Sequence, residues 1–291
     1  MIAAPRRSFS VAIPGRAPLV LGPRTLVMGV LNVTPDSFSD GGKALDPAHA
    51  LDLAMAMEAS GADLLDIGAE STRPGAAAVP ADEEIARALP VLKALAPRVK
   101  VPISIDTYKS ATARIALDEG ASIVNDISAF AFDEELATLV AQRGVPAVVM
   151  HTRGRPEDMY AQAEYGDVVG DIVNDLHRSI DRAHARGVNF AQLIVDPGLG
   201  FAKRAPHSMA ALVGLERLAE LGLPILVGAS RKSFLAAATG PLPSEDRDWP
   251  TAGAVTAAIL GGAHIVRVHA VDKMVHVARF ADALRLAMNR F

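Results

Sequence analysis

Residues 28–42 read MGVLNVTPDSFSDGG, and this stretch decides the fold. Its first part is an unbroken apolar run, whereas the part after Asn32 is a polar loop rich in Pro, Ser, Asp and Gly. An unbroken apolar run is typical of a parallel β-strand that is buried on both faces. In α/β proteins the loop at the C-terminal end of such a strand carries the chemistry. We therefore expect Asn32 to lie where a buried strand opens into a site.

An apolar strand followed by a helix recurs along the whole chain. Strands are expected at residues 26–33, 63–69, 102–106, 122–127, 146–151, 192–196, 224–229 and 264–269. Helices are expected at residues 47–60, 82–95, 110–119, 133–143, 166–186, 208–221, 251–260 and 272–290. A further helix is expected to begin at residue 231 and to be interrupted at residues 240–243. Such alternation indicates a parallel sheet. Eight units in 291 residues predict an α/β fold, a closed (β/α)8 TIM barrel. The alternative, an open doubly wound sheet, lacks its G-x-G-x-x-G loop after the first strand.

The N-terminal segment, residues 1–24, precedes this alternation. Residues 9–21 alternate weakly around Pro14-Gly15, which predicts a short β-hairpin that covers the bottom of the barrel. No linker divides the rest of the chain, so we expect residues 1–291 to form a single barrel domain.

Composition excludes several classes of function. A net charge of -4 gives no electrostatic case for binding nucleic acid or an anionic membrane. The chain has no cysteine, so a metal would need oxygen or imidazole ligands. Neither a signal peptide nor a membrane-spanning segment is expected, which favours a soluble cytoplasmic protein.

Polar residues stand at the end of every expected strand. They are Asn32, Asp66, Glu70 to Gly75, Asp106, Asn125 and Asp126, His151, Asp196, Ser230 to Lys232, Arg267 and His269. The C-terminal ends of barrel strands converge on one mouth. Unpaired charge is costly at a half-buried position, so we expect these groups to face a matching ligand.

The mixture of groups suggests what the ligand is. Several groups are cationic or can become so, and arginine forks match phosphate oxygens, so a phosphate or diphosphate is expected. The cationic set is Arg73, Arg231, Lys232, Arg267 and His269. The acceptors suit a flat heterocycle with several N–H groups, and they are Asp66, Asp106, Asn125 and Asp196. Alternatively, Asp66 and Asp106 orient neighbouring arginines.

Hard oxygen ligands for magnesium lie next to the expected phosphate. Asn32, Asp36 and Asp40 offer them, and magnesium bound with a diphosphate usually takes few protein ligands. The alternative is that Asp36 and Asp40 are turn formers, since Pro-Asp and Asp-Gly steps are common in turns.

These motifs resemble those of the dihydropteroate synthase family. The two long signatures are LNVTPDSFSDGG at residues 31–42 and GAESTRPG at residues 68–75. Shorter matches follow in family order: SIDT at 104–107, VNDI at 124–127, DPGLGFAK at 196–203, SRKS at 230–233 and RVH at 267–269. The sequence departs from the family pattern at Thr152, Arg153 and Ala270.

The resemblance implies the reaction and its residues. It implies an enzyme that joins 6-hydroxymethyl-7,8-dihydropterin diphosphate to 4-aminobenzoate. It also implies that Mg²⁺ binds near Asn32 and that the protein forms a homodimer. Under the family pattern the pterin is held by Asp106, Asn125, Asp196 and Lys232, over a floor at Met150. The diphosphate is held by Asn32, Arg73, Arg267 and His269. The aminobenzoate is framed by Thr72, Pro74 and Ser230, with Phe201 lining the pocket and Phe38 and Asp40 closing over it. Arg231 is also expected to bind substrate.

Two competing functions remain at this point. A pterin-binding methyltransferase domain, which passes a methyl group to a corrinoid protein, uses a similar barrel but does not need Arg73, Arg267 and His269. A non-catalytic paralogue that binds pterin would be expected to lose residues of the first loop or the last strand, and none is lost here.

Overall fold

The computed structural model describes residues 3–34 and 47–288, apart from the side chain of Glu245. Eight parallel strands form one sheet in the order β8-β7-β6-β5-β4-β3-β10-β9. A parallel bridge between Val195 and Ile225 joins its two edges, so the barrel is nearly closed. The strands are β3 (Leu26–Asn32), β4 (Leu64–Gly68), β5 (Ile103–Asp106), β6 (Ile123–Asp126), β7 (Ala147–Met150), β8 (Leu193–Asp196), β9 (Leu226–Val227) and β10 (Ile265–Val268). The predicted eight-stranded barrel is confirmed.

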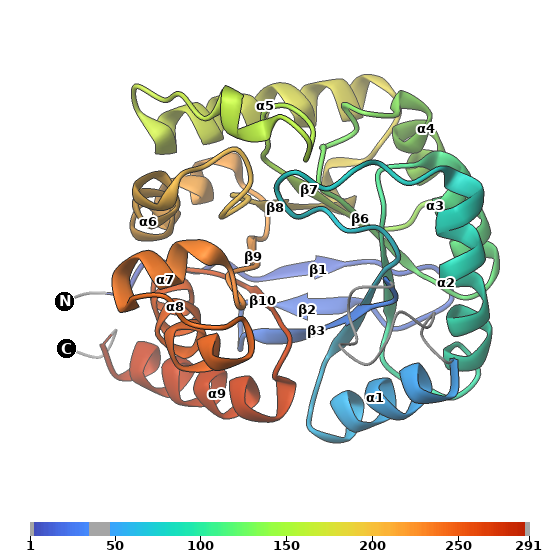
Figure 1. Cartoon of the computed structure of the whole chain (residues 1–291), viewed down its shortest axis with the longest axis horizontal. Coiled ribbons are helices and arrows are strands. Elements are labelled where there is room, and N and C mark those ends of the chain that lie inside the picture. The colour runs from blue at the N-terminus through green and yellow to red at the C-terminus, as the bar shows by residue number, and fades with distance from the viewer. Residues whose placement is uncertain (1–2, 35–46, 289–291) are drawn as a thin grey trace.

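Helices surround this barrel (Figure 1). The α-helices are α1 (Pro47–Ala59), α2 (Ala81–Leu95), α3 (Ser110–Asp118), α4 (Glu134–Arg143), α5 (Val168–Ala185), α6 (Ala205–Val213), α7 (Ser233–Thr239), α8 (Asp248–Leu260) and α9 (Val271–Met288). Short 3-10 helices are η2 (Met159–Gln162), η3 (Phe190–Gln192), η4 (Leu215–Leu221) and η5 (Glu245–Arg247). None of the helices in the described ranges is long and apolar enough to cross a membrane.

Local sequence explains where several helices begin and end. The side chain of Asp133 accepts a hydrogen bond from the backbone of Glu135 and so caps α4, whereas that of Asp167 accepts one from Gly170 and caps α5. Gly144 ends α4 with φ 62°, a conformation that glycine adopts without strain. The main apolar core fills the space between the helices and the outer face of the sheet.

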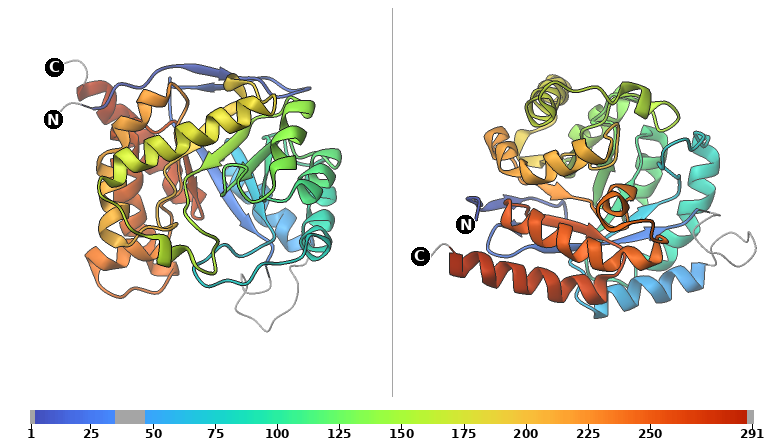
Figure 2. Two further views of the ribbon diagram at one scale, coloured as in Figure 1. Left: turned by 90° about the horizontal axis from the view of Figure 1, so that it is seen from above. Right: turned by 60° about the vertical axis from the view of Figure 1, so that its left-hand side comes forward.

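A second apolar cluster fills the bottom of the barrel. The hairpin of β1 (Phe9–Val11) and β2 (Leu19–Leu21) is antiparallel, and it crosses one end of the barrel in Figure 2. Its residues Val11, Leu19 and Leu21 join a buried cluster with strand residues such as Met28 and Ile265. The expectation that the N-terminal hairpin covers the bottom of the barrel is therefore confirmed.

Two differences from the predicted helices have a clear physical cause. The helix expected at 208–221 is divided into α6 and η4, which meet at Gly214. A Cβ at Gly214 would lie 2.7 Å from a methyl carbon of Val169, so close packing against α5 excludes a good helix former there. The helix expected from residue 251 already starts at Asp248, because Pro250 is tolerated in the first turn of a helix.

The burial of the hairpin against the bottom of the barrel predicts an effect on the stability of the protein. Leu21→Ala should lower the free energy of unfolding by about 2–5 kcal/mol, because Leu21 is fully buried and its removal leaves a cavity. Val20→Ala is the matched control, since Val20 is 57% exposed on the other face of the same strand. Urea unfolding measures both variants. Equal effects would show that the hairpin is not part of the core.

Candidate active site

A cleft of about 360 Å³ opens at the C-terminal ends of the barrel strands. Every described residue that the family resemblance assigns to the site lines it, whereas Asp36, Phe38 and Asp40 lie outside the described ranges. The predicted residues that line it are Asn32, Thr72, Arg73, Pro74, Asp106, Asn125, Met150, Asp196, Phe201, Ser230, Arg231, Lys232, Arg267 and His269. The structure therefore brings together residues that are up to 237 positions apart in sequence, from Asn32 to His269.

Arg267 is the centre of the polar network on the cleft floor. From β10, its Nε donates to Asp66 Oδ2 at 2.6 Å and its Nη2 donates to Asp106 Oδ2 at 2.7 Å. Asn125 Nδ2 donates to the same oxygen of Asp66 at 3.0 Å. Asp66 is fully buried and does not line the cleft, so it orients Arg267 and Asn125. Of the two roles left open for Asp66, the structure shows the orienting one.

Asp106 both holds Arg267 and lines the cleft. Burial raises the pKa of Asp106, with Asp66 acting in the same direction, whereas the positive charge of Arg267 opposes both. Two carboxylates thus share one guanidinium. A ligand that offers N–H donors to Asp106 would supply the stabilisation that this carboxylate lacks in the free protein.

Lys232 and Asp196 face each other across Gly228. A Cβ at Gly228 would lie 3.8 Å from Lys232 Nζ and 3.9 Å from Asp196 Oδ2. Burial lowers the pKa of Lys232 to about 8, although the negative charge of Asp196 opposes the shift. Lys232 Nζ donates to the carbonyl of Leu199 at 2.5 Å and lies 4.6 Å from the ring centre of Phe201. The ammonium is therefore held over the aromatic wall of the cleft.

Ser230 and His269 form a second polar pair at the rim. The Ser230 hydroxyl oxygen accepts from the backbone N–H of His269 at 3.1 Å and lies 2.9 Å from His269 Nδ1. Burial lowers the pKa of His269 to about 3, and the charges of Arg267, Arg231 and Arg73 add to that effect. The imidazole is therefore neutral in the free protein.

Arg231 makes a contact that the sequence did not reveal. Its Nε and Nη2 donate to the two carboxylate oxygens of Asp248 at 2.8 and 3.2 Å, and Lys273 binds the same carboxylate. Its charge is thus balanced within the protein. Arg247 also lines the cleft, and it donates to the carbonyls of Leu242 and Arg231. Sequence reasoning missed Arg247. The Gly- and Pro-rich interruption at residues 240–243 indicated a loop before it, and loops at this end of a barrel often carry binding residues.

Not every polar residue at a strand end points into the cleft. Asp66, Asp126 and His151 do not line it, so the expectation that all of them face one mouth is wrong for these three. Asp126 and His151 each follow a residue that does line it, Asn125 or Met150, and successive strand side chains point to opposite faces. Asp126 instead accepts hydrogen bonds from the backbone N–H groups of Ser128 and Phe130.

Comparison with known proteins agrees with this geometry. A family model described as "Pterin binding enzyme" matches residues 28–269. A dihydropteroate synthase of Synechocystis is 44% identical over 90% of this chain and 91% of its own. A Xanthomonas albilineans dihydropteroate synthase solved with 4-aminobenzoic acid has a TM-score of 0.89 and 39% identity, covering 96% of this chain and 99% of its own. A Yersinia pestis dihydropteroate synthase solved with a sulfonamide drug also has a TM-score of 0.89, with 38% identity, covering 96% of this chain and 100% of its own.

These similarities run through the barrel and the motifs that line its cleft. They favour a synthase over both the corrinoid-linked methyltransferase and the non-catalytic paralogue. The chain belongs to the dihydropteroate synthase family, the transferases of folate biosynthesis that form 7,8-dihydropteroate.

Proposed function

We propose that this cleft divides the family's reaction among three groups of its own residues. The substrates are 6-hydroxymethyl-7,8-dihydropterin diphosphate and 4-aminobenzoate, and the products are 7,8-dihydropteroate and diphosphate. The observation that carries the proposal is that one cleft holds both hydrogen-bond acceptors and cations, among them the exposed Arg73. The half-buried Asp106 and the buried Asp196 lie on its floor, whereas the exposed cation Arg73 and the neutral His269 lie at its rim.

The floor would bind the pterin ring. Asp106, Asn125 and Asp196 present oxygens to ring N–H groups, and Lys232 offers N–H groups to ring acceptors. Met150 packs with Ile127 and Phe201 into a small apolar cluster that would contact the flat face of the ring. This arrangement fits a heterocycle with donors and acceptors on one edge.

The rim would bind the diphosphate. Among the described residues Arg73 has no ion-pair partner, so its charge is available to a ligand. Arg267 adds a second guanidinium, and the neutral imidazole of His269 can donate a hydrogen bond. Positive charge that is placed in advance stabilises a leaving diphosphate most in the transition state.

The third group of cleft residues would hold 4-aminobenzoate. Thr72 and Pro74 come from the β4–α2 loop, Ser230 from the segment after β9 and Phe201 from the β8–α6 loop. The Xanthomonas albilineans relative was solved with this compound bound. Arg247 lines the same cleft and adds a cation for a carboxylate.

We propose a dissociative substitution at the pterin methylene carbon. The carbon–oxygen bond to the diphosphate breaks first, and the oxygen keeps the electron pair. The neutral aniline nitrogen of 4-aminobenzoate then attacks the resulting cation and afterwards loses its proton. The carboxylate of Asp196 near the ring would stabilise the developing positive charge. Diphosphate release from the pterin substrate alone supports this order, and strict dependence of that release on aminobenzoate contradicts it.

We also propose that Mg²⁺ binds together with the diphosphate. No group of three or more His, Asp or Glu side chains suited to a metal occurs in the described part of the chain. The metal would therefore take most ligands from the substrate and water, and the amide oxygen of Asn32 in the cleft fits as a single protein ligand. When bound, the ion would neutralise charge on the leaving group.

A homodimer is proposed from the exposed apolar side chains of neighbouring helices. Val213 on α6, Trp249 on α8 and Phe280 on α9 are 84%, 87% and 70% exposed, and α8 packs against both α6 and α9. Exposed apolar surface of this kind marks interaction sites. Sedimentation of the native protein as a dimer, and of Phe280→Asp as a monomer, would support the proposal, whereas a monomeric native protein at micromolar concentration would end it.

The direct test of the function is product formation. Native protein should form 7,8-dihydropteroate from the two substrates in the presence of Mg²⁺ and much less in its absence. Lys232→Ala should lower kcat/KM by about 100-fold or more, the usual effect of removing one preorganised donor. Lys93→Ala, on the outer surface of α2, is the matched control. A folded native protein that binds the pterin but gives no product would favour the non-catalytic alternative.

The depressed pKa of Lys232 predicts the pH dependence. Burial lowers it to about 8, so the cation is present below this pH and is lost as the pH rises through it. We expect kcat/KM to fall above pH 8, because this ratio reports groups of the free enzyme. In the Lys232→Arg variant the guanidinium stays charged, so kcat/KM of this variant should not fall between pH 8 and 10. This holds even if kcat/KM of the variant is lower than that of the native protein at every pH from 6 to 10. The same fall in both proteins would assign it to another group.

A further inference from the structure

Lys203 is a buried lysine outside the cleft, and burial lowers the pKa of its amine well below the usual value. It lies on the β8–α6 loop, is 1% exposed and does not line the cleft. Its Nζ lies 2.7 Å from His151 Nδ1, and it donates to the carbonyls of Phe201 at 3.0 Å and Gly198 at 3.1 Å. A buried ammonium is costly unless its donors are paired, so these contacts fix where Lys203 and its partners lie.

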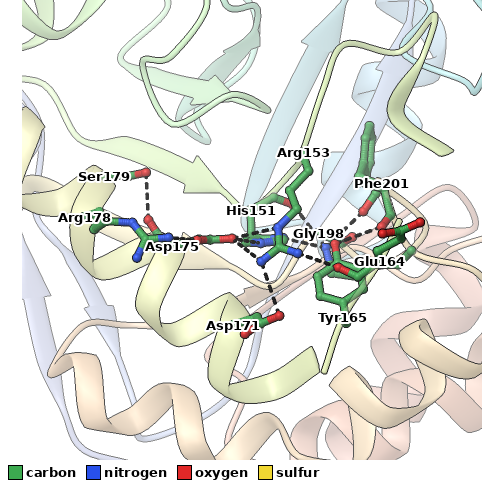
Figure 3. A network of polar contacts seen from close by, with 12 residues as sticks. His151, Arg153, Glu164, Tyr165, Asp171, Asp175, Arg178, Ser179, Gly198 and Phe201 are labelled. Carbon is green, nitrogen blue, oxygen red and sulfur yellow. Dashed lines mark hydrogen bonds and ion pairs between the residues drawn. The ribbon is translucent and has the colours of Figure 1, made fainter. Parts of the chain in front are cut away.

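From His151, the partner of Lys203, a polar chain continues to Asp175 on helix α5 (Figure 3). His151 Nε2 lies 3.0 Å from Asp175 Oδ2, and Arg153 Nε donates to the same oxygen at 3.0 Å. Arg178 binds the other oxygen of Asp175. If the Nε2–H of His151 donates a hydrogen bond to Asp175, Nδ1 of the neutral ring is left as the acceptor for Lys203. Burial lowers the pKa of His151 to about 3, which agrees with a neutral ring.

The same loop packs closely against the backbone of His151, which directly follows β7. Gly198 has φ 66°, and a Cβ there would lie 2.0 Å from the carbonyl oxygen of His151, so only glycine fits. The backbone N–H of Gly198 donates to Asp196 Oδ1 at 2.7 Å. The loop is therefore fixed at its start by a residue of the cleft floor.

Lys203 and Lys232 both bind backbone carbonyls of the same short loop, residues 198–201. Lys203 binds the carbonyls of Gly198 and Phe201, and Lys232 binds the carbonyl of Leu199 between them. Phe201, whose carbonyl Lys203 binds, also places its ring 4.6 Å from Lys232 Nζ. Displacement of this loop would therefore move both the acceptor and the aromatic partner of Lys232.

We propose that Lys203, oriented by His151 and Asp175, is a positioning residue that holds the loop 198–201 in the shape that Lys232 requires to bind the pterin substrate. Lys203 does not touch the substrate and acts through Lys232. The inference rests on the proposed role of Lys232 in pterin binding. Two departures from the family pattern lie beside this network, at Thr152 and Arg153, and Arg153 takes part in it through Asp175.

A double-mutant cycle tests whether Lys203 acts through Lys232. Lys203→Met removes the ammonium and keeps the apolar stem, and calorimetry measures the Kd of 6-hydroxymethyl-7,8-dihydropterin diphosphate. We expect Lys203→Met to raise this Kd about tenfold or more in the native background and less than about threefold in the Lys232→Ala background, since coupled residues are not additive. Equal effects in both backgrounds would overturn the proposal. Lys93→Met is the control for loss of an exposed lysine.

A pair of His151 variants provides a second test if Lys203→Met does not fold. His151→Asn retains an acceptor near the position of Nδ1, beside Lys203, whereas His151→Gln retains a polar group near Nε2, beside Asp175. We expect the pterin Kd to rise more for His151→Gln. Native affinity in both variants would contradict the proposal. Since these experiments measure binding, absence of product formation by the native protein would count against the proposed function without changing their outcome.

Discussion

The structure of the site depends on one guanidinium held between two carboxylates. Arg267 reaches from β10 to Asp66 on β4 and Asp106 on β5, and Asn125 on β6 binds the same Asp66 oxygen. Charged groups are tolerated at such depth only when they are paired. Because Asp66 is fully buried, the pairing fixes the position of Arg267 before any ligand arrives. Asp106 remains at the cleft surface and can serve a ligand as well.

Much of this architecture could be predicted from the sequence. The apolar run that ends at Asn32 is β3, and the repeated strand–helix pattern indicated the eight parallel strands. Buried strands need apolar residues on both faces, and this signal is strong over short distances. Residues at strand ends such as Asp106 and Asp196 were predictable for the same reason, since the barrel brings all C-terminal ends to one mouth.

Contacts between distant side chains could not be predicted in this way. Strand pattern alone did not show that His151 turns outward while Met150 turns inward, because that depends on where each strand ends. The pair between Arg231 and Asp248 and the contacts of the buried Lys203 likewise depend on how loops pack. The break at Gly214 follows from the approach of Val169, which lies on another helix.

The most direct test of the account removes one charge beneath the cleft. Asp66→Asn keeps the size of the side chain, but it leaves Arg267 without its fully buried anionic partner. Loss of one member of a buried charge pair costs about 2–5 kcal/mol, so kcat/KM should fall about 30-fold or more in a protein that still folds. Asp63→Asn is the control, since Asp63 pairs with the exposed Arg24. A kcat/KM within about twofold of native for Asp66→Asn would contradict the claim that this buried pair organises the site.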